Sequence, residues 1–409
     1  MRPSHRLVQG QALCFAAQVQ RFPVPRIDSP LKARLFYAAD KPHYVFQKAQ
    51  QPVDTVNTDT PHPDALVEDL AYENAILQGV SRTFALTIPQ LPSGLRAVVG
   101  NAYLLCRIAD TIEDSDTLTL EEKRRYYDWF VGAVELKASS SEFGRELASK
   151  LQGSTLEAER DLVRNTERVL RITHSFSDAD QAALQRCIRI MSAGMEDFQE
   201  GRFTDGLRDQ EHLDAYCYHV AGVVGEMLTE LFCAHSRDIA SCKDELERRA
   251  ISFGQGLQMT NILKDIWDDK KRRVCWLPQV TFARAGFDLR NLESAAGDPA
   301  FHAALGQLIA VARRHLENAL DYTLLIPKSE RGIRNFCLWA IGMAVLTLRK
   351  INRQRDFTSG AEVKISRRSV RATICLADFL GGSNRLLRLA FRLAAAGLPE
   401  SQPLAPGNA

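Results

Sequence analysis

Residues 261–269 read NILKDIWDD, and Asn261, Asp265 and Asp269 recur there at every fourth position. An α-helix turns once in about 3.6 residues, so this spacing predicts that the three side chains share one helix face. The apolar run GQGLQMTNIL leads into the stretch and indicates a helix that crosses the core. Carboxylates on one face repel one another, and stability alone does not favour them. We therefore expect a cation to bind this face.

A similar pattern occurs earlier in the chain, where residues 107–114 read RIADTIED after the apolar run NAYLLCRI. Helical spacing places Asp110 and Asp114 on one face, with Glu113 beside them. We call these three residues the first acidic cluster, and Asn261, Asp265 and Asp269 the second. Buried carboxylates without a partner are too costly to persist. Since Mg²⁺ prefers oxygen ligands and completes its shell with water and phosphate, the two clusters predict a magnesium site.

Two simpler explanations compete with a metal site. Each cluster taken alone fits an acidic helix end in solvent, but two clusters of similar form on apolar helices favour the metal. The basic run KKRR at 270–273 explains Asp268 by pairing and leaves the face of the second cluster unexplained.

Basic and hydroxyl side chains near the clusters are candidates to bind a phosphorylated ligand. The sequence SRTF supplies Ser81 and Arg82, Arg107 lies one turn before the first cluster, and Lys264 and Arg273 flank the second. An arginine inside an apolar helix needs a partner for its guanidinium. The alternative interpretations are a structural salt bridge for Arg107 and a solvent-facing Lys264.

The overall pattern predicts one all-α domain. The chain has 409 residues with a net charge of +2, so its charge balance indicates no nucleic-acid partner. Proline-rich residues 1–65 read as an irregular arm, residues 66–395 as the helical domain and residues 396–409 as a flexible tail. Thr119, and Ser175 or Ser177, are expected N-caps. AEVKIS at 361–366 is the one strand candidate, and the nine cysteines read as reduced thiols.

Two further segments have helical patterns. In YCYHVAGVVGEMLTELF (216–232), Gly222 and Gly225 indicate close helix packing. In SNRLLRLAFRLAAAGL (383–398), arginines and leucines occupy different faces of an amphipathic helix. Such a helix lies on a membrane surface or docks on the core. No apolar stretch is long enough to predict a transmembrane helix.

The motifs SRTFALTIPQLP, YLLCRIADTIED, YCYHVAGVVGE and GLQMTNILKDIWDDKKRRVCWLPQ together resemble the squalene/phytoene synthase family over about residues 72–370. The resemblance implies an all-α isoprenoid-synthase fold around a central apolar cavity. It also implies that both clusters hold Mg²⁺, or Mn²⁺ in its place, and the diphosphates of two prenyl donors.

Further residue roles follow from this resemblance. Tyr103 and Tyr216 match tyrosines near the reacting carbons, and His219 stands beside VAG where animal and fungal squalene synthases tend to carry a tyrosine; we count all three as candidate catalytic residues. The positions that match diphosphate or cofactor contacts are Ser81, Arg82, Arg107, Lys264, Arg273, Lys364 and Arg367.

The C-terminal third resembles the squalene synthase branch, where a Lys–Ile pair follows a short polar loop. We predict condensation of two farnesyl diphosphates through presqualene diphosphate, followed by NADPH reduction to squalene. Ser366 stands where an arginine is usual, which leaves open a dehydrosqualene- or phytoene-type synthase, or a presqualene diphosphate synthase. A head-to-tail prenyl transferase, a terpene cyclase and a non-catalytic scaffold are alternatives of other classes. We expect a cytoplasmic monomer in peripheral contact with a membrane's inner face.

Overall fold

The computed structural model describes residues 63–400 except 82, 154 and 202, and all of these belong to one compact unit, Thr60–Ala409. The described residues form helices and turns without a β-strand, which confirms the all-α prediction. The strand predicted at 361–366 is wrong, because these residues form turns that lead into the next helix. Helices begin at Pro63 and end at Ala395, and the predicted arm lies almost entirely outside the described residues.

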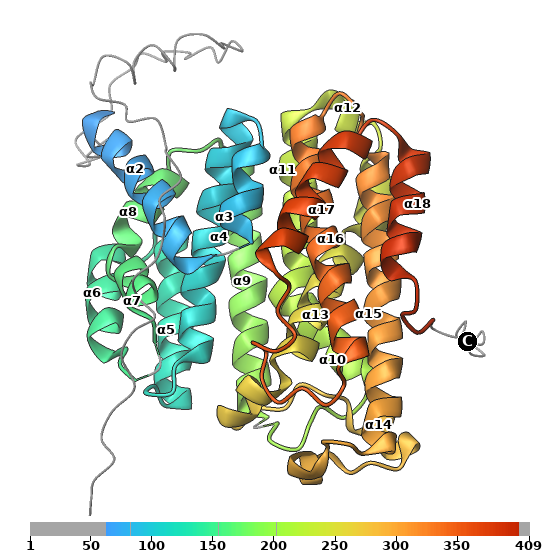
Figure 1. The fold of residues 1–409 in the computed structure, drawn as a ribbon. Coiled ribbons are helices and arrows are strands. Elements are labelled where there is room, and N and C mark those ends of the chain that lie inside the picture. The colour runs from blue at the N-terminus through green and yellow to red at the C-terminus, as the bar shows by residue number, and fades with distance from the viewer. Residues whose placement is uncertain (1–62, 82, 154, 202, 401–409) are drawn as a thin grey trace, which may run out of the picture. The chain divides into compact units, whose positions relative to one another are not determined.

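The helices follow one another through short connections (Figure 1). In chain order the elements are α2 (Pro63–Val80), α3 (Phe84–Thr87), η1 (Ile88–Gln90), α4 (Ser93–Asp114), α5 (Leu120–Val134), α6 (Ser140–Lys150), α7 (Glu157–Arg164), α8 (Thr166–Thr173), α9 (Asp178–Glu200), α10 (Gln210–Cys217), η2 (Tyr218–Gly222), α11 (Val223–His235), α12 (Arg237–Ala240), α13 (Lys243–Lys271), α14 (Gln279–Ala285), η3 (Leu289–Ser294), α15 (Pro299–Leu325), α16 (Arg331–Arg353), α17 (Arg367–Leu380) and α18 (Asn384–Ala395).

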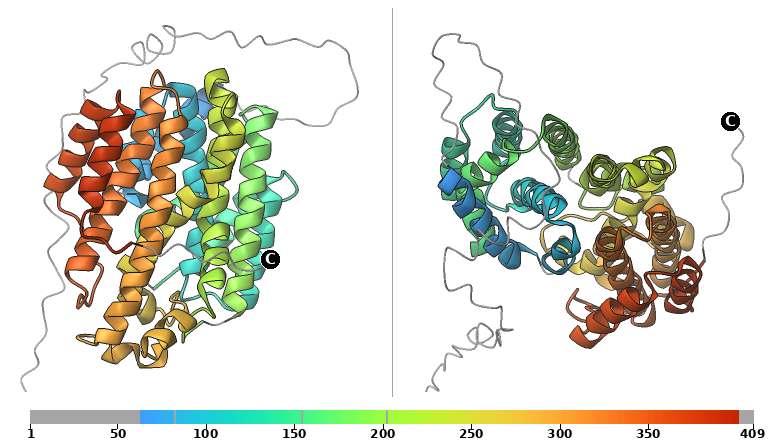
Figure 2. Two further views of the ribbon diagram at one scale, coloured as in Figure 1. Left: turned by 90° about the vertical axis from the view of Figure 1, so that its right-hand side faces the viewer. Right: turned by 90° about the horizontal axis from the view of Figure 1, so that it is seen from above.

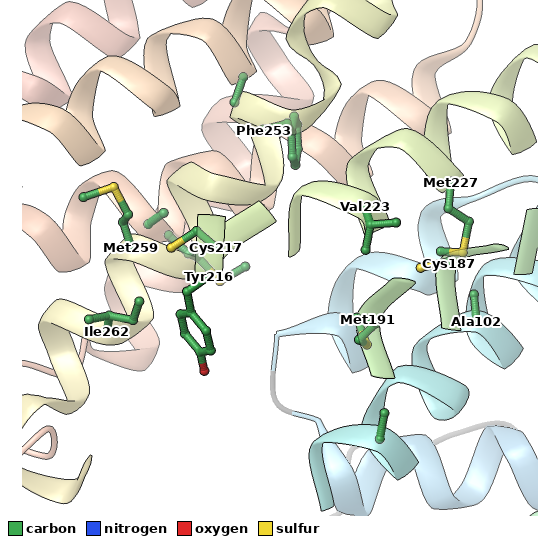
Figure 3. Packing of buried hydrophobic residues seen from close by; sticks show 14 of the residues in the cluster. Ala102, Cys187, Met191, Tyr216, Cys217, Val223, Met227, Phe253, Met259 and Ile262 are labelled. Carbon is green, nitrogen blue, oxygen red and sulfur yellow. The ribbon is translucent and has the colours of Figure 1, made fainter. Parts of the chain in front are cut away.

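Helices α2 to α8 lie on one side of the unit and α10 to α18 on the other (Figures 1 and 2). Helix α9 lies between them and contacts α4 and α5 on one side and α11 on the other. Helix α13 packs against α11, α15 and α16, so it crosses the core as its apolar approach run predicts. The same hydrophobic core joins the two sides. Figure 3 shows part of it, including Ala102 of α4, Met191 of α9, Val223 of α11 and Ile262 of α13.

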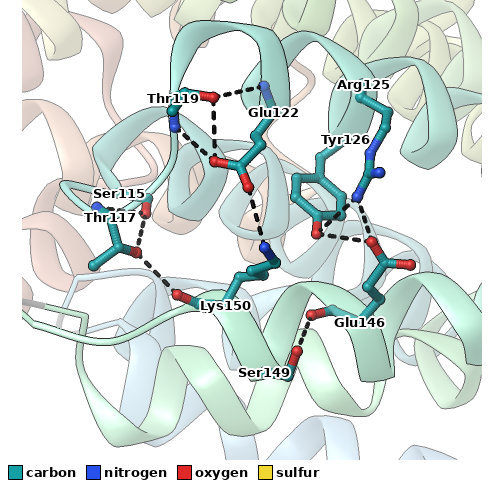
Figure 4. A network of polar contacts seen from close by, with 9 residues as sticks. All are labelled: Ser115, Thr117, Thr119, Glu122, Arg125, Tyr126, Glu146, Ser149 and Lys150. Atoms are coloured by element: carbon teal, nitrogen blue, oxygen red, sulfur yellow. Dashed lines mark hydrogen bonds and ion pairs between the residues drawn. The ribbon is translucent and has the colours of Figure 1, made fainter.

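Two expected N-caps are present. The Thr119 hydroxyl accepts from the Glu122 backbone N–H at 3.2 Å, and the Glu122 carboxylate accepts from the Thr119 N–H at 2.9 Å, which completes a capping box. Lys150 of α6 donates to the same carboxylate at 3.2 Å and so fixes α5 to α6 (Figure 4). At the start of α9, Ser177 rather than Ser175 is the cap, and it accepts from the Asp180 N–H at 3.2 Å.

The glycines near residue 222 allow the close helix packing that the sequence predicts. A Cβ on Gly225 would lie 2.0 Å from the Ala250 carbonyl oxygen of α13. On the facing helix, a Cβ on Gly254 would lie 2.0 Å from the Ala221 carbonyl oxygen. Glycine at both contacts lets the backbones of η2 and α11 approach α13 directly, which holds the second acidic cluster's helix in place.

Candidate active site

The first acidic cluster occupies the C-terminal end of α4. Arg107 contacts Asp110, with Nη1 3.5 Å from Oδ2, and forms a hydrogen bond to Glu159 of α7. Burial raises the pKa of Asp110 to about 6, although the charge of Arg107 opposes this shift. Burial also raises the pKa of Glu113 well above its usual range, and its buried Oε1 has no hydrogen-bond partner among the described residues. The nearby cations therefore do not offset the effect of burial on the pKa of Asp110 and Glu113.

The second acidic cluster lies on the last turns of α13. Asp269 is buried, and burial raises its pKa to about 6 against the opposing effect of Arg272. Arg272 Nη2 lies 2.5 Å from Asp269 Oδ1. Lys264 Nζ lies 2.7 Å from Asp265 Oδ2, so this lysine does not simply point to solvent. Asn261, the third member, is exposed.

Arg272 joins the two clusters. Its Nη1 donates to Asp114 at the end of α4, while its Nη2 bonds Asp269 of α13. The structure therefore brings together two patterns that are far apart in the sequence. The basic run 270–273 explains Asp268 by pairing, as the sequence suggests, and it also reaches a member of the second cluster. The bond to Asp268 comes from Lys271, at 2.9 Å.

Sequence reasoning singled out Arg273 and missed Arg272. Arg273 is exposed and adopts a left-handed backbone conformation with φ of 61°, and it follows directly after the bridge. The signal that identifies Arg272 is its spacing, since it stands three residues after Asp269 and helical neighbours at that distance form ion pairs. The contact with Asp114 carries no comparable local signal.

The side chains of the two clusters fit a hard divalent cation in their chemistry. All candidate donors are oxygens, and Glu113 offers a buried oxygen without a partner. Within the described part of the chain, no three His, Cys, Asp or Glu side chains are grouped closely enough to hold a metal ion. The positive charge between the clusters is instead the guanidinium of Arg272. A cation that binds both clusters therefore has to displace this side chain.

Aromatic side chains lie near the clusters. The Tyr216 ring is stacked on Trp276 with centroids 3.8 Å apart, and its side chain is buried (Figure 3). Burial raises the pKa of Tyr216 well above its usual range, and the carboxylates of Glu113 and Asp114 add to the shift. Tyr127, which sequence reasoning missed, has a buried hydroxyl without a partner among the described residues, and burial beside the first cluster raises its pKa too.

The other candidate catalytic residues have ordinary hydrogen-bond partners. Tyr103 donates from its hydroxyl to the Val80 carbonyl at 3.0 Å. His219 lies in the π-helical turn η2, with Nδ1 3.4 Å from the Ile190 carbonyl oxygen. Ser81, a candidate diphosphate contact, accepts from the Phe84 N–H at 3.0 Å. Arg82 lies outside the described residues.

Two further candidate cofactor residues, Lys364 and Arg367, lie on the connection between α16 and α17 and at the start of α17. This connection contacts the second acidic cluster, since a Cβ on Gly360 would lie 2.8 Å from Asp265 Oδ1. Lys364 follows four residues later, and its carbonyl accepts from Lys350 Nζ at 2.7 Å. Arg367 is the first residue of α17. The connection thus passes the second cluster at Gly360, four residues before Lys364.

Two small pockets lie among the helices of the site. One has about 160 Å³ of space beside Asp269, and the other about 190 Å³ between α11, α13 and α15–α16. Sites for small organic ligands usually have about 300–1,000 Å³, so neither pocket by itself has room for a long hydrocarbon. The pocket between the helices is lined by Gly225, Leu228, Phe232, Phe253, Tyr322 and Cys337.

The chain is similar to known proteins over most of its length. A model of the squalene/phytoene synthase family matches residues 77–369. The squalene synthase of Dictyostelium discoideum is 30% identical over 333 residues, which are 80% of this chain and 74% of that protein. Squalene synthase BSS of Botryococcus braunii is 29% identical over 288 residues, 69% of this chain, and the match spans only 58% of that relative's length.

The fold itself is similar to a solved structure. The complex of TcSQS with the ligand BPH1237 matches with a TM-score of 0.66 at 24% sequence identity. The match covers 84% of this chain and 94% of that one, so it includes nearly every described helix.

Proposed function

Because the chain belongs to the squalene/phytoene synthase family, we propose that it is a squalene synthase, which joins two farnesyl diphosphates head to head and reduces the product with NADPH. The observation that carries this proposal is the bridge from Asp114 of α4 through Arg272 to Asp269 of α13. It holds two oxygen-rich clusters around one positive charge. A site that binds diphosphate with a divalent metal needs this combination of charges.

The two clusters would hold Mg²⁺, or Mn²⁺ in its place. When bound, the metal supplies the charge that stabilises a departing diphosphate. Asp110 and Asp269, each with a pKa of about 6, are largely ionised at neutral pH, and burial raises the pKa of Glu113 further above its usual range. The proposed ligands are Asp110, Glu113, Asp114, Asn261, Asp265 and Asp269.

Basic side chains would bind the diphosphate oxygens. Arg107 is held at the edge of the first cluster by Glu159 and Asp110, which fixes the direction of its guanidinium. Arg272, once released from the clusters, adds a second guanidinium at the same place. The remaining proposed contacts are Ser81, Arg82, Lys264 and Arg273.

In the proposed reaction, the C–O bond of one farnesyl diphosphate breaks and its electron pair leaves with the diphosphate. The allylic cation is attacked by the double bond of the second substrate, and loss of a proton closes the cyclopropane of presqualene diphosphate. The rings of Tyr103 and Tyr216 would stabilise these cations through their faces, with His219 as a further candidate in the adjoining π-helical turn. The apolar core keeps water away from the cations.

Reduction distinguishes this branch of the family. After a second ionisation and rearrangement, NADPH would supply hydride to the final cation. Lys364 and Arg367 are the proposed contacts to its phosphates, with Lys264 and Arg107 at the inner end of the site. The approach of Gly360 to Asp265 supports this assignment, because the connection that contains Lys364 and leads to Arg367 passes the second cluster there.

The test is one incubation of the full chain with farnesyl diphosphate and Mg²⁺, with and without NADPH, followed by mass analysis. We expect squalene with NADPH, and presqualene diphosphate or dehydro products without it. Asp110→Ala and Asp265→Ala should each abolish turnover while the protein stays folded by circular dichroism. Identical products with and without NADPH would rule out the reductive branch.

Other outcomes select the alternatives. Dehydrosqualene under both conditions indicates a synthase that ends by proton loss, and arrest at presqualene diphosphate indicates a synthase of that intermediate alone. Geranylgeranyl diphosphate as the preferred substrate indicates the phytoene type. Prenyl diphosphates are the proposed partners. We also propose that the protein is a monomer that contacts a membrane peripherally.

A further inference from the structure

Exposed apolar side chains gather on the last two helices. Of the eleven large hydrophobic residues exposed in the described chain, five lie between residues 376 and 393. Phe379 is 85% exposed, the highest value among them. The five are Leu376, Phe379, Leu386, Leu389 and Leu393.

These side chains lie on the exposed faces of α17 and α18. Helices α17 and α18 contact each other and both pack on α16, so their opposite faces are turned outward (Figures 1 and 2). Ala377 of α17 and Leu387 and Phe391 of α18 are buried against the rest of the unit. The sequence predicted an amphipathic helix only for the region of α18. Helix α17 also has an exposed apolar stripe, which consists of Ala372, Cys375, Leu376 and Phe379. We call the outer surface of both helices the hairpin face.

The hairpin face is strongly basic at its borders. Residues 367–396 contain six arginines and a single acidic residue, Asp378. Asp378 accepts from Asn335 Nδ2 of α16 at 2.9 Å and keeps its negative charge, and Arg388 pairs with Asp321 of α15. The six arginines outnumber these two carboxylates, so the charge around the leucines is basic on balance. The arginines are Arg367, Arg368, Arg371, Arg385, Arg388 and Arg392.

We propose that the hairpin face docks on a lipid bilayer that contains anionic lipids, with Phe379 and the leucines among the acyl chains and the arginines at the headgroups. Apolar residues flanked by arginine are typical of helices that lie in the membrane interface. A second copy of the chain is a poorer occupant, because a symmetric contact sets one basic border against another. No described helix is long and apolar enough to span a membrane, so the contact is with one surface.

The test is co-sedimentation of the full chain with phosphatidylcholine vesicles, with and without about one third phosphatidylglycerol. We expect binding only to the anionic vesicles, and binding that weakens as salt is raised. Leu376→Ser/Phe379→Ser should weaken binding about tenfold or more. Arg385→Gln/Arg392→Gln should weaken it by about fivefold for each arginine, as expected for basic side chains near an anionic surface.

Matched controls separate this surface from general stickiness. Val67→Ser/Leu156→Ser removes two equally exposed apolar side chains elsewhere, and Arg145→Gln/Arg164→Gln removes two exposed arginines from the other side of the unit. Neither should change vesicle binding. The proposal is overturned if the hairpin variants bind vesicles like the parent, or if they only convert a dimer to a monomer in light scattering. Because the readout is vesicle binding, it stands or falls independently of squalene formation.

Discussion

At the scale of single residues, Arg272 has the largest consequence for the site. It donates to Asp114 and Asp269 at once, and so it satisfies both clusters with one charge. The same contacts make it a competitor of any cation that needs these two carboxylates. The resting protein thus holds Asp114 and Asp269 close together on one guanidinium, and cation binding at both carboxylates has to exchange one positive charge for another.

We expect Arg272→Gln to tighten Mn²⁺ binding to the protein in the absence of diphosphate. Removal of the competing guanidinium should raise the affinity about tenfold, which corresponds to about 1.4 kcal/mol. Isothermal titration at pH 8 measures it directly. Arg273→Gln is the matched control and should bind Mn²⁺ like the parent. Equal affinities for the parent and Arg272→Gln would show that this side chain does not compete with the metal.

A second residue-scale prediction concerns Glu73 of α2, which lies outside the site. Its carboxyl is buried, accepts from Asn101 Nδ2 at 2.8 Å, and has its pKa raised by burial to about 8. A raised pKa in the folded state means that the folded protein binds an extra proton. Protonation of Glu73 therefore stabilises the folded state. This contribution to the free energy of unfolding is complete below about pH 4.5 and is lost as the pH rises through 8.

Glu73→Gln keeps the acceptor oxygen for Asn101 and removes the titration. We expect the free energy of unfolding of the parent to fall relative to this variant between pH 5 and pH 9, by on the order of 4 kcal/mol. Urea unfolding at several pH values gives the difference. Parallel pH profiles for the two proteins would contradict the assignment of this proton to Glu73.

At the scale of elements, the close contacts between helices depend on glycine. Gly254 of α13 faces the Ala221 carbonyl oxygen, and that neighbour is backbone, so it cannot rotate away. We expect Gly254→Ala to destabilise the protein by about 1–3 kcal/mol, the usual cost of overpacking, or more. Thermal unfolding of the purified variant checks this.

The control for this change is a glycine with free space around it. Gly94, in the first turn of α4, has no atom within 4 Å of an added Cβ. Gly94→Ala should therefore be neutral or stabilise the protein by up to about 1 kcal/mol, because alanine restricts the unfolded chain. Destabilisation of equal size in both variants would mean that the contact with Ala221 is not the cause.

Local patterns in the sequence predicted the all-α class and several of the helices. The capping box at Thr119, the cap at Ser177 and the glycine contacts of η2 and α11 depend on neighbours a few residues apart or on small size alone. AEVKIS has the alternation of a strand, but a strand needs a partner to pair with, and these residues form turns between two helices.

The candidate site was predictable in part from local sequence, because its acidic ligands repeat with helical spacing. Arg272 bonds Asp114 across 158 residues of sequence, and Tyr127 approaches the first cluster from α5. Such contacts are set by tertiary packing, so no spacing rule identifies them.

At the scale of the whole molecule, the two clusters belong to helices on opposite sides of α9, α4 with the N-terminal helices and α13 with the C-terminal ones. A ligand that binds both clusters therefore ties the two sides of the unit together. Any ligand that binds only the folded state raises stability, by about 2.7 kcal/mol at 100 times its Kd. The clusters thus couple ligand binding to the stability of the entire helical unit.

We expect Mg²⁺ together with inorganic pyrophosphate to raise the Tm of the full chain by about 2–5 °C, and either one alone to raise it much less, because the metal and the anion each supply charge that the other needs. Differential scanning fluorimetry at a fixed scan rate measures the shift. Asp269→Asn should remove most of it, since Asp269 is the buried member of the second cluster that Arg272 joins to α4. Asp268→Asn is its matched control, because the neighbouring carboxylate is exposed and pairs with Lys271 instead. If Asp269→Asn keeps the full shift, or if Asp268→Asn loses it equally, the ligand does not bind through the face that Asn261, Asp265 and Asp269 share.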